Sequence, residues 1–196
     1  DATKHPGSVI RINLDGSIPK TNPKFINNNE WLPEIFQIGI RNSQGIALSP
    51  FNNKIYISNH GPKGGDFIGE VNSGGNYGWK EIGWGGTNYS GTKIGTGDAF
   101  NSKFTKPILT WVPSIAPSGI IFYKGNKFQE WQGDLLVTSL KYNMLIRINF
   151  ENNKIVNETI LFKDKIFRIR DIEVDHEGNI YLISDQNNSS LWKLTR

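Results

Sequence analysis

The sequence predicts an all-β fold, a partial β-propeller of about three to four blades in 196 residues. Apolar and polar residues alternate along short segments, as they do in half-buried strands. A succession of strand, turn, strand, loop and strand returns at intervals of roughly 45 to 80 residues, which is typical of propeller blades with loop insertions. No window carries an apolar stripe at i, i+3 and i+4 through four turns, so helices are not expected. We therefore expect blades of four-stranded antiparallel sheet within a single domain over residues 1–196.

One strand type alternates strictly and ends in a turn or at the chain end. It appears at residues 8–14 before Asp15-Gly16, at residues 144–150 and at residues 191–194. Asp15-Gly16 is a turn signal, and residues 144–150 likewise run into Glu151-Asn152-Asn153, so these strands look like copies of one structural element.

A second type is a turn followed by a short apolar strand that ends in Ser, and another strand precedes each copy. Together these pairs form the inner part of each predicted blade. The turn-plus-strand copies are residues 52–58, 132–139 and 177–184, and the preceding strands are residues 45–50, 119–123 and 172–175.

Residues 71–107 form a long loop insertion that is rich in Gly, Asn, Ser and Thr. Tyr77, Trp79, Trp84 and Tyr89 are embedded in it. Aromatic residues in a glycine-rich loop often pack on one another, and we place this interpretation ahead of a sugar-stacking surface.

Composition excludes several classes of function. The 22 Lys and Arg residues exceed the 18 Asp and Glu residues by four and are scattered, which favours an anionic ligand over a nucleic-acid track. Cysteine is absent, so disulfides and thiolate metal sites are excluded. No apolar run reaches about 18 residues, so no membrane-spanning helix is expected.

Cationic side chains fall at equivalent ends of the predicted inner strands. If these ends converge on one channel, then Arg41, Lys141, Arg168 and Arg170 lie close together, and such a cluster repels itself unless a polyanion or carboxylates sit among them. Taken singly, the Arg41-Asn42 pair is an ordinary turn and Lys141 an ordinary surface lysine.

Arg168 and Arg170 have strand spacing, so both point to one face. A solvated strand face, or salt bridges to Asp164 and Asp171, would explain an isolated Arg-x-Arg equally well. The shared placement of these arginines with the other cations is what favours a ligand site.

The stretch from His60 to Asp66 contains three glycines and a proline, so we expect its backbone to adopt unusual conformations. His60 has no second His nearby and no zinc motif, so a packed or backbone-bonded His is favoured over a base or metal ligand. Gly61-Pro62 presents bare carbonyl oxygens, which are hard ligands of the kind that calcium takes. A simple strand-ending turn is the alternative for this pair.

Seven motifs in one order resemble the soluble aldose sugar dehydrogenases, or glucose/sorbosone dehydrogenases, which use pyrroloquinoline quinone (PQQ) on a six-bladed β-propeller. The resemblance runs across nearly the whole chain. The motifs lie at residues 7–19, 41–45, 60–66, 76–79, 113–119, 131–135 and 168–171.

The resemblance implies a partial six-bladed β-propeller, with calcium and PQQ as cofactors. Gly61 and Pro62 would give carbonyl oxygens to the calcium, and Arg41 and Asn42 would bond the quinone oxygen that gains charge on reduction. The remaining residues implied around the cofactor and its carboxylates are Gln44, Ser114, Lys141, Arg168 and Arg170.

The resemblance also implies an aldose substrate, oxidised at the anomeric carbon to a lactone, and a periplasmic or secreted location. The family's general base is a His in the N-terminal half of the propeller, to which His60 does not correspond. We therefore expect a C-terminal portion, with the remaining blades supplied by an upstream segment, a second chain or self-association. A non-catalytic module for a sugar or carboxylated ligand is the alternative, followed by a calcium-dependent lactone hydrolase that would need Asp66. Phe67 stands where relatives carry Glu, which argues against a second calcium.

Overall fold

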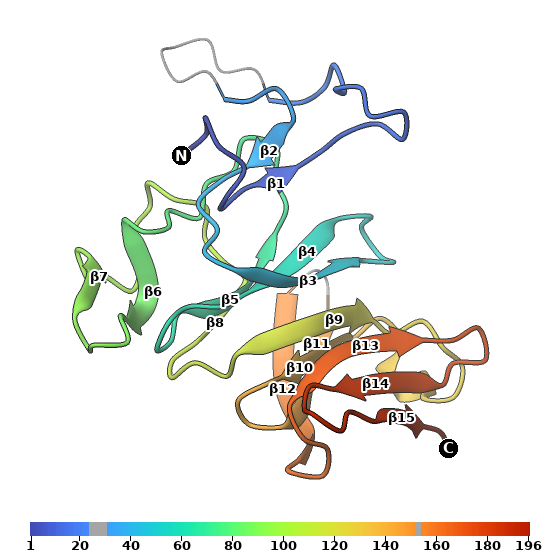
Figure 1. The fold of residues 1–196 in the computed structure, drawn as a ribbon. Coiled ribbons are helices and arrows are strands. Elements are labelled where there is room, and N and C mark those ends of the chain that lie inside the picture. The colour runs from blue at the N-terminus through green and yellow to red at the C-terminus, as the bar shows by residue number, and fades with distance from the viewer. Residues whose placement is uncertain (24–30, 152–153) are drawn as a thin grey trace.

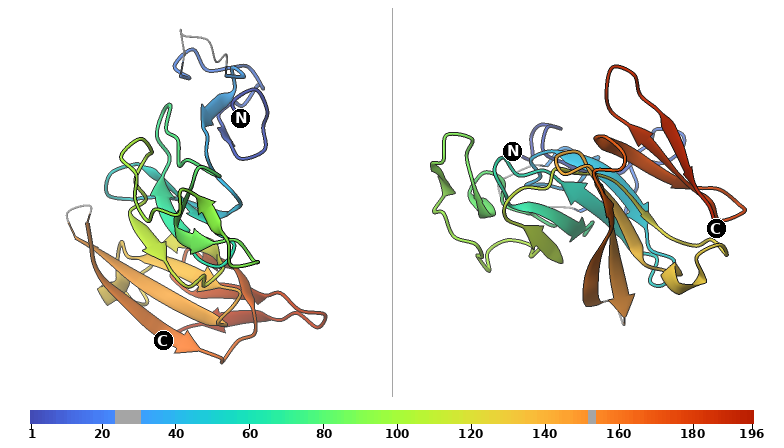
Figure 2. Two further views of the ribbon diagram at one scale, coloured as in Figure 1. Left: turned by 90° about the vertical axis from the view of Figure 1, so that its left-hand side faces the viewer. Right: turned by 90° about the horizontal axis from the view of Figure 1, so that it is seen from below.

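The computed structural model describes residues 1–23, 31–151 and 154–196 (Figure 1). Within these residues the secondary structure is strands and one 3-10 turn, η1 (Gln129–Trp131), and no helix is long and apolar enough to cross a bilayer. The predicted all-β fold is confirmed. A small two-stranded sheet near the N-terminus is followed by three larger sheets that splay apart like blades when viewed from below (Figure 2).

The N-terminal sheet pairs β1 (Val9–Ile10) with β2 (Ile35–Gln37). The expected strand over residues 8–14 is shortened to its first part. Beyond β1 the amide of Asn13 already donates to the carbonyl of Ser17, closing a local turn. Pairing with β2 therefore stops early.

The first four-stranded blade is ordered β3-β4-β5-β8. The insertion at residues 71–107 lies between its third and fourth strands and contains a second hairpin, β6 with β7. These strands are β3 (Ser43–Leu48), β4 (Ile55–Asn59), β5 (Asp66–Glu70), β6 (Ile82–Thr87), β7 (Lys93–Gly95) and β8 (Leu109–Trp111).

The second blade is ordered β9-β10-β11-β12, and the third sheet, β13-β14-β15, has three strands in the described residues. All neighbouring strands are antiparallel. The bounds are β9 (Pro117–Phe122), β10 (Leu135–Ser139), β11 (Met144–Glu151), β12 (Lys154–Lys163), β13 (Ile169–Val174), β14 (Ile180–Ser184) and β15 (Leu191–Leu194).

Each blade packs face to face on the next. On β10, Leu135 and Val137 join the core shared with the first blade, while Leu136 joins the core shared with the third sheet. Alternate side chains of a strand point to opposite faces, so a strand covered on both sides is apolar throughout. This explains why β10 is buried along its whole length.

Two glycines let the inner strands approach closely. A Cβ on Gly45 would lie 2.9 Å from the amide nitrogen of Ile120, and one on Gly119 would lie 2.8 Å from Cα of Asp171. These contacts are closer than side chains permit, so β3, β9 and β13 meet through bare backbone. The inner strand ends, where the predicted cations lie, are thereby brought together.

Buried hydroxyl groups tie the same strands. The Oγ of Ser58 donates to the carbonyl of Ser118 at 2.7 Å, and the Oγ of Ser118 donates to the carbonyl of Ile169 at 2.6 Å. Ile169 separates Arg168 from Arg170, so this chain of bonds fixes the backbone of both arginines relative to the first blade.

Candidate functional site

The loop from Gly61 to Gly65 joins β4 to β5 and packs backbone against backbone. Gly64 and Gly65 have φ of +132° and +73°, values that favour glycine. A Cβ on Gly61 would overlap the carbonyl of Gly64, and one on Gly65 would overlap the carbonyl of Gly83 in β6. The glycines are therefore needed to close the loop and to seat the β6–β7 hairpin on it.

Asp66, the first residue of β5, is fully buried and accepts hydrogen bonds from two loops. Its Oδ1 accepts from the amide of Gly61 at 2.7 Å. Its Oδ2 accepts from the Oγ of Ser114 at 2.7 Å and from the amides of Ile115 and Ala116 at 2.8 Å. Four donors satisfy the buried carboxylate, so Asp66 clamps the Gly61–Gly65 loop to the Ser114 loop.

His60 is backbone-bonded, as the sequence favoured. Its Nε2 lies 2.5 Å from the carbonyl oxygen of Pro117, and a carbonyl only accepts, so this nitrogen carries the proton and donates it. Burial lowers the pKa of His60, against a smaller raising effect of Asp66. The Nε2 is thus committed to structure and is not a base.

Arg41 lies against the carbonyls at the start of the same loop. Its Nη1 donates to the carbonyl of His60 at 3.2 Å and to that of Gly61 at 3.4 Å. Its guanidinium carbon also lies 5.5 Å from the ring centroid of Trp79 and 5.9 Å from that of Tyr89. Two aromatic faces and two carbonyls hold this cation.

Arg168 and Arg170 share one carboxylate, that of Asp185, at 3.3 and 2.5 Å. The sequence suggested Asp164 and Asp171 as partners, and this was wrong. Asp185 follows the end of β14, which pairs with β13 and so carries this carboxylate beside both arginines. The bond from Arg170 is the main cause that lowers the pKa of Asp185.

Asn42 and Gln44 extend the network across the first and third sheets. The Nε2 of Gln44 donates to the Oδ1 of Asn42 at 2.7 Å, and Arg170 donates to the Oε1 of Gln44 at 2.9 Å. The amide of Asn42 is held by the Oδ1 of Asn59 at 2.8 Å. Both side chains are therefore connected to the arginine cluster.

A hollow of about 620 Å³ opens between these loops. Of the nine residues that the sequence assigned to a cofactor or to calcium, five line it: Gly61, Pro62, Ser114, Lys141 and Arg168. The other four are not among its lining residues, although Arg41 contacts Gly61 and the three others form the network just described. The remaining lining residues are His60, Lys63, Tyr89, Pro113, Ala116, Leu140 and Asn143.

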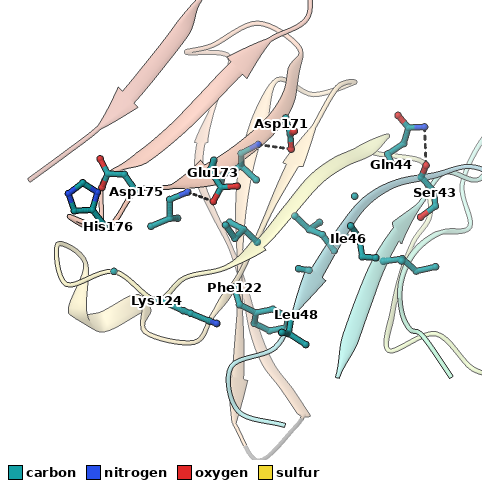
Figure 3. Close-up of a pocket in the computed structure, with 18 of the residues that line it drawn as sticks. Ser43, Gln44, Ile46, Leu48, Phe122, Lys124, Asp171, Glu173, Asp175 and His176 are labelled. Carbon is teal, nitrogen blue, oxygen red and sulfur yellow. Dashed lines mark hydrogen bonds between the residues drawn. The ribbon is translucent and has the colours of Figure 1, made fainter. Parts of the chain in front are cut away.

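A second, larger trough of about 850 Å³ lies along the inner strands (Figure 3). Ile46 and Leu48 from β3 and Glu173 from β13 line it, and Gln44 and Asp171 are also among its residues. Gln44 links the trough to the arginine cluster through Arg170. The trough is lined mainly by β3, β9 and β13, the first strands of the three larger sheets.

Metal ligands of the usual side-chain kind are lacking: within residues 1–23, 31–151 and 154–196, no group of three His, Cys, Asp or Glu is placed to hold an ion. A backbone oxygen is another kind of metal ligand. The carbonyl oxygen of Gly61 already faces a cation, the Arg41 guanidinium. Backbone carbonyls are hard ligands that suit Ca²⁺. Gly61 is therefore the residue of this loop whose carbonyl oxygen has the chemistry of a calcium ligand.

A model of the protein family described as Glucose / Sorbosone dehydrogenase matches residues 1–193. The chain belongs to the glucose/sorbosone dehydrogenase family. The resemblance seen in the sequence is thereby confirmed.

Curated relatives in this family are longer. Aldose sugar dehydrogenase YliI of Escherichia coli (strain K12) is 36% identical over 196 residues, covering 100% of this chain and 52% of the relative. Quinoprotein glucose dehydrogenase B of Acinetobacter calcoaceticus is 31% identical over 240 residues, covering 94% of this chain and 49% of the relative. The chain spans about half the length of the curated relatives it matches.

Solved structures of the family superpose closely. A glucose dehydrogenase matches with a TM-score of 0.93 and 33% identity, and the soluble aldose sugar dehydrogenase of Escherichia coli in its apo form with 0.91 and 35%. Each match covers 100% of this chain and 56% of the other. The PQQ-bound aldose sugar dehydrogenase of Streptomyces coelicolor, at 20% identity and a TM-score of 0.75, shares the fold. The partial propeller is confirmed.

Sequence reasoning missed four features of the site. Asp66 was considered only as a metal ligand, although its place directly after two glycines is a signal that a carboxylate must bond loop amides. The ion pairs of Asp185 with the two arginines leave no local signal in the sequence, because the partners are distant along the chain. The same holds for the packing of Gly83 against Gly65. Tyr89 was noted only within the aromatic insertion.

Proposed function

We propose that this chain forms the cofactor-binding part of a quinone-dependent aldose sugar dehydrogenase, which oxidises the anomeric carbon of an aldose to a lactone. The observation that carries the proposal is the hollow bounded by Gly61, Ser114, Lys141 and Arg168. Among the residues that the structure describes, no carboxylate lies within ion-pair distance of Lys141, so a positive charge there is left for an anionic ligand. A tricarboxylate cofactor has the matching charge.

PQQ, when bound, supplies a quinone that accepts the hydride from the sugar. Arg41 would hold the negative charge that develops on a quinone oxygen, with Asn42 as a second donor. The carbonyls of Gly61 and Pro62 would hold calcium in position beside them.

The carboxylates of the cofactor need fixed cations, and Lys141, Arg168 and Arg170 would provide them. Arg168 and Arg170 keep one shared carboxylate, Asp185, which neutralises only part of their charge. Ser114 and Gln44 would orient the cofactor by hydrogen bonds. Contacts of this kind hold the cofactor in one orientation, which places its quinone for the reaction.

We propose that the general base is supplied by the remaining blades. His60, the His in the hollow, donates from its Nε2 to Pro117 and so does not take a proton there. This also supports the alternative function, a non-catalytic module that binds a sugar or carboxylated ligand.

The same blades would complete the ring, whether they come from an upstream segment, a second chain or self-association. Ile46 and Leu48 on the trough face are 64% and 52% exposed, and Leu191 on β15 is 69% exposed. Apolar surface of this extent is typical of a face that another part of the protein covers. A periplasmic or secreted location belongs to the same proposal.

Reconstitution tests the proposal. The protein completed with its remaining blades is loaded with PQQ and calcium, and the reduction of an artificial electron acceptor is followed on addition of an aldose. Aldose-dependent reduction supports the dehydrogenase. Tight PQQ binding without aldose-dependent reduction would instead favour the non-catalytic module, and absence of PQQ binding would contradict both.

A further inference from the structure

The β6–β7 hairpin is fixed directly on the Gly61–Gly65 loop (Figure 1). The amide of Lys63 donates to the carbonyl of Thr87 at 3.1 Å. A Cβ on Gly86 would overlap the carbonyl of Gly64, so the two backbones touch. The hairpin therefore packs backbone to backbone on the loop, and the turn that joins β6 to β7 lies beside the hollow.

That turn is braced by its own polar groups. The amide of Asn88 donates to the carbonyl of Thr92 at 2.9 Å, and its Nδ2 donates to the Oγ1 of Thr92 and the carbonyl of Lys93, both at 3.0 Å. A turn closed by three hydrogen bonds presents its central side chains in a defined position.

Tyr89, in this turn, is the aromatic residue of the insertion that faces the hollow. Tyr77 and Trp84 are 1% and 5% exposed and pack in a core cluster, as self-packing predicts, whereas Tyr89 is 68% exposed. Its ring lines the hollow together with Pro62 and lies 5.9 Å from the guanidinium carbon of Arg41. Tyr89 is thus held in place without serving the core.

We propose that Tyr89 is a sugar-binding residue whose ring stacks against the C–H face of the aldose on the side of the hollow nearest Arg41. The inference rests on the proposed function and adds the group that binds the sugar. An aromatic face offers apolar contact to axial C–H bonds, and a rigid Tyr offers it at low entropic cost. Its place beside Arg41 puts the sugar next to the cation assigned to the quinone oxygen.

Steady-state kinetics of the completed, PQQ- and calcium-loaded protein test this. In Tyr89→Ala we expect KM for the aldose to rise about 5- to 10-fold with kcat changed less than about twofold, because the lost contact stabilises bound sugar and transition state alike. Tyr89→Phe and Tyr89→Trp keep a ring and should restore KM. The dissociation constant of PQQ, measured by titration without sugar, should stay within about twofold of wild type.

Phe100→Ala is the matched control, since Phe100 is a 55% exposed aromatic residue of the same insertion and does not line the hollow. Its KM should equal that of wild type. An unchanged KM in Tyr89→Ala, with wild type active, overturns this inference alone. A loss of PQQ affinity in Tyr89→Ala equal to the rise in KM also overturns it, because Tyr89 would then only support the cofactor loop. A wild-type protein that oxidises no aldose overturns the proposed function and this inference with it.

Discussion

Replacing Asp66 with Asn isolates the buried clamp between the two loops of the site. The side chain keeps its shape, but an amide offers one acceptor oxygen where the carboxylate offers two. Three donors face Oδ2 and one faces Oδ1, so the amide best keeps its oxygen toward Ser114, Ile115 and Ala116. The amide N–H groups then face the N–H of Gly61, which loses its partner.

The cost follows from these bonds. One charge-assisted hydrogen bond is lost, a buried N–H is left without an acceptor, and the three remaining hydrogen bonds are no longer made to a charged group. Together these losses lower the free energy of unfolding by about 3 to 5 kcal/mol. For a domain of this size that lowers Tm by about 10 °C. Urea unfolding of wild type and Asp66→Asn measures it.

The matched control is Asp98→Asn, an exposed carboxylate bonded within its own turn to Thr96. We expect its free energy of unfolding to stay within about 0.5 kcal/mol of wild type. If Asp66→Asn were equally harmless, the clamp would contribute nothing and the reasoning about the two loops would be wrong.

Three further predictions concern packing, charge and pH. Gly65→Ala should cost at least about 2 kcal/mol more than Gly91→Ala in thermal unfolding, since both have positive φ but only Gly65 meets backbone; equal costs would refute the seating of the hairpin. Arg168→Ala should weaken PQQ binding about tenfold or more in calorimetric titration, whereas Arg196→Ala, paired with Glu130 elsewhere, should not; equal affinities would remove Arg168 from the site. Hydrogen bonds, first of all from the side chain of Asn179, lower the pKa of Asp175 from 3.8 to about 2. The stability that the Asp175 carboxylate adds to the folded state is therefore full above pH 3.8 and is lost as the pH falls through about 2. Urea unfolding of Asp175→Ala and wild type over this range should show the gap closing, and a constant gap would refute it.

The strand pattern was readable from the sequence because burial on alternate faces leaves a local trace. Residues 144–150 alternate and form β11, and residues 191–194 form β15 as expected. The hairpin inside the insertion was not readable, because β6 places glycines where a strand would normally show apolar side chains. Those glycines serve a contact with the Gly61–Gly65 loop, about 20 residues away in sequence.

The charged residues of the site could be predicted from the sequence, but the residues that they contact could not. Gly61, Ser114, Lys141 and Arg168 do gather around one hollow. Arg170 bonds Gln44 across 126 positions, a distance over which sequence carries no pairing signal. The same holds for the bond of Asp66 to Ser114, so the charges could be identified while the clamp that positions them could not.

Calcium-dependent binding of PQQ to the completed protein tests the central claim most directly. We expect calorimetric titration to show saturable binding at one site, weakened at least about tenfold when a chelator removes calcium. Binding of equal strength with and without calcium, and in Arg168→Ala, would contradict a site built from the Gly61 and Pro62 carbonyls and the surrounding cations.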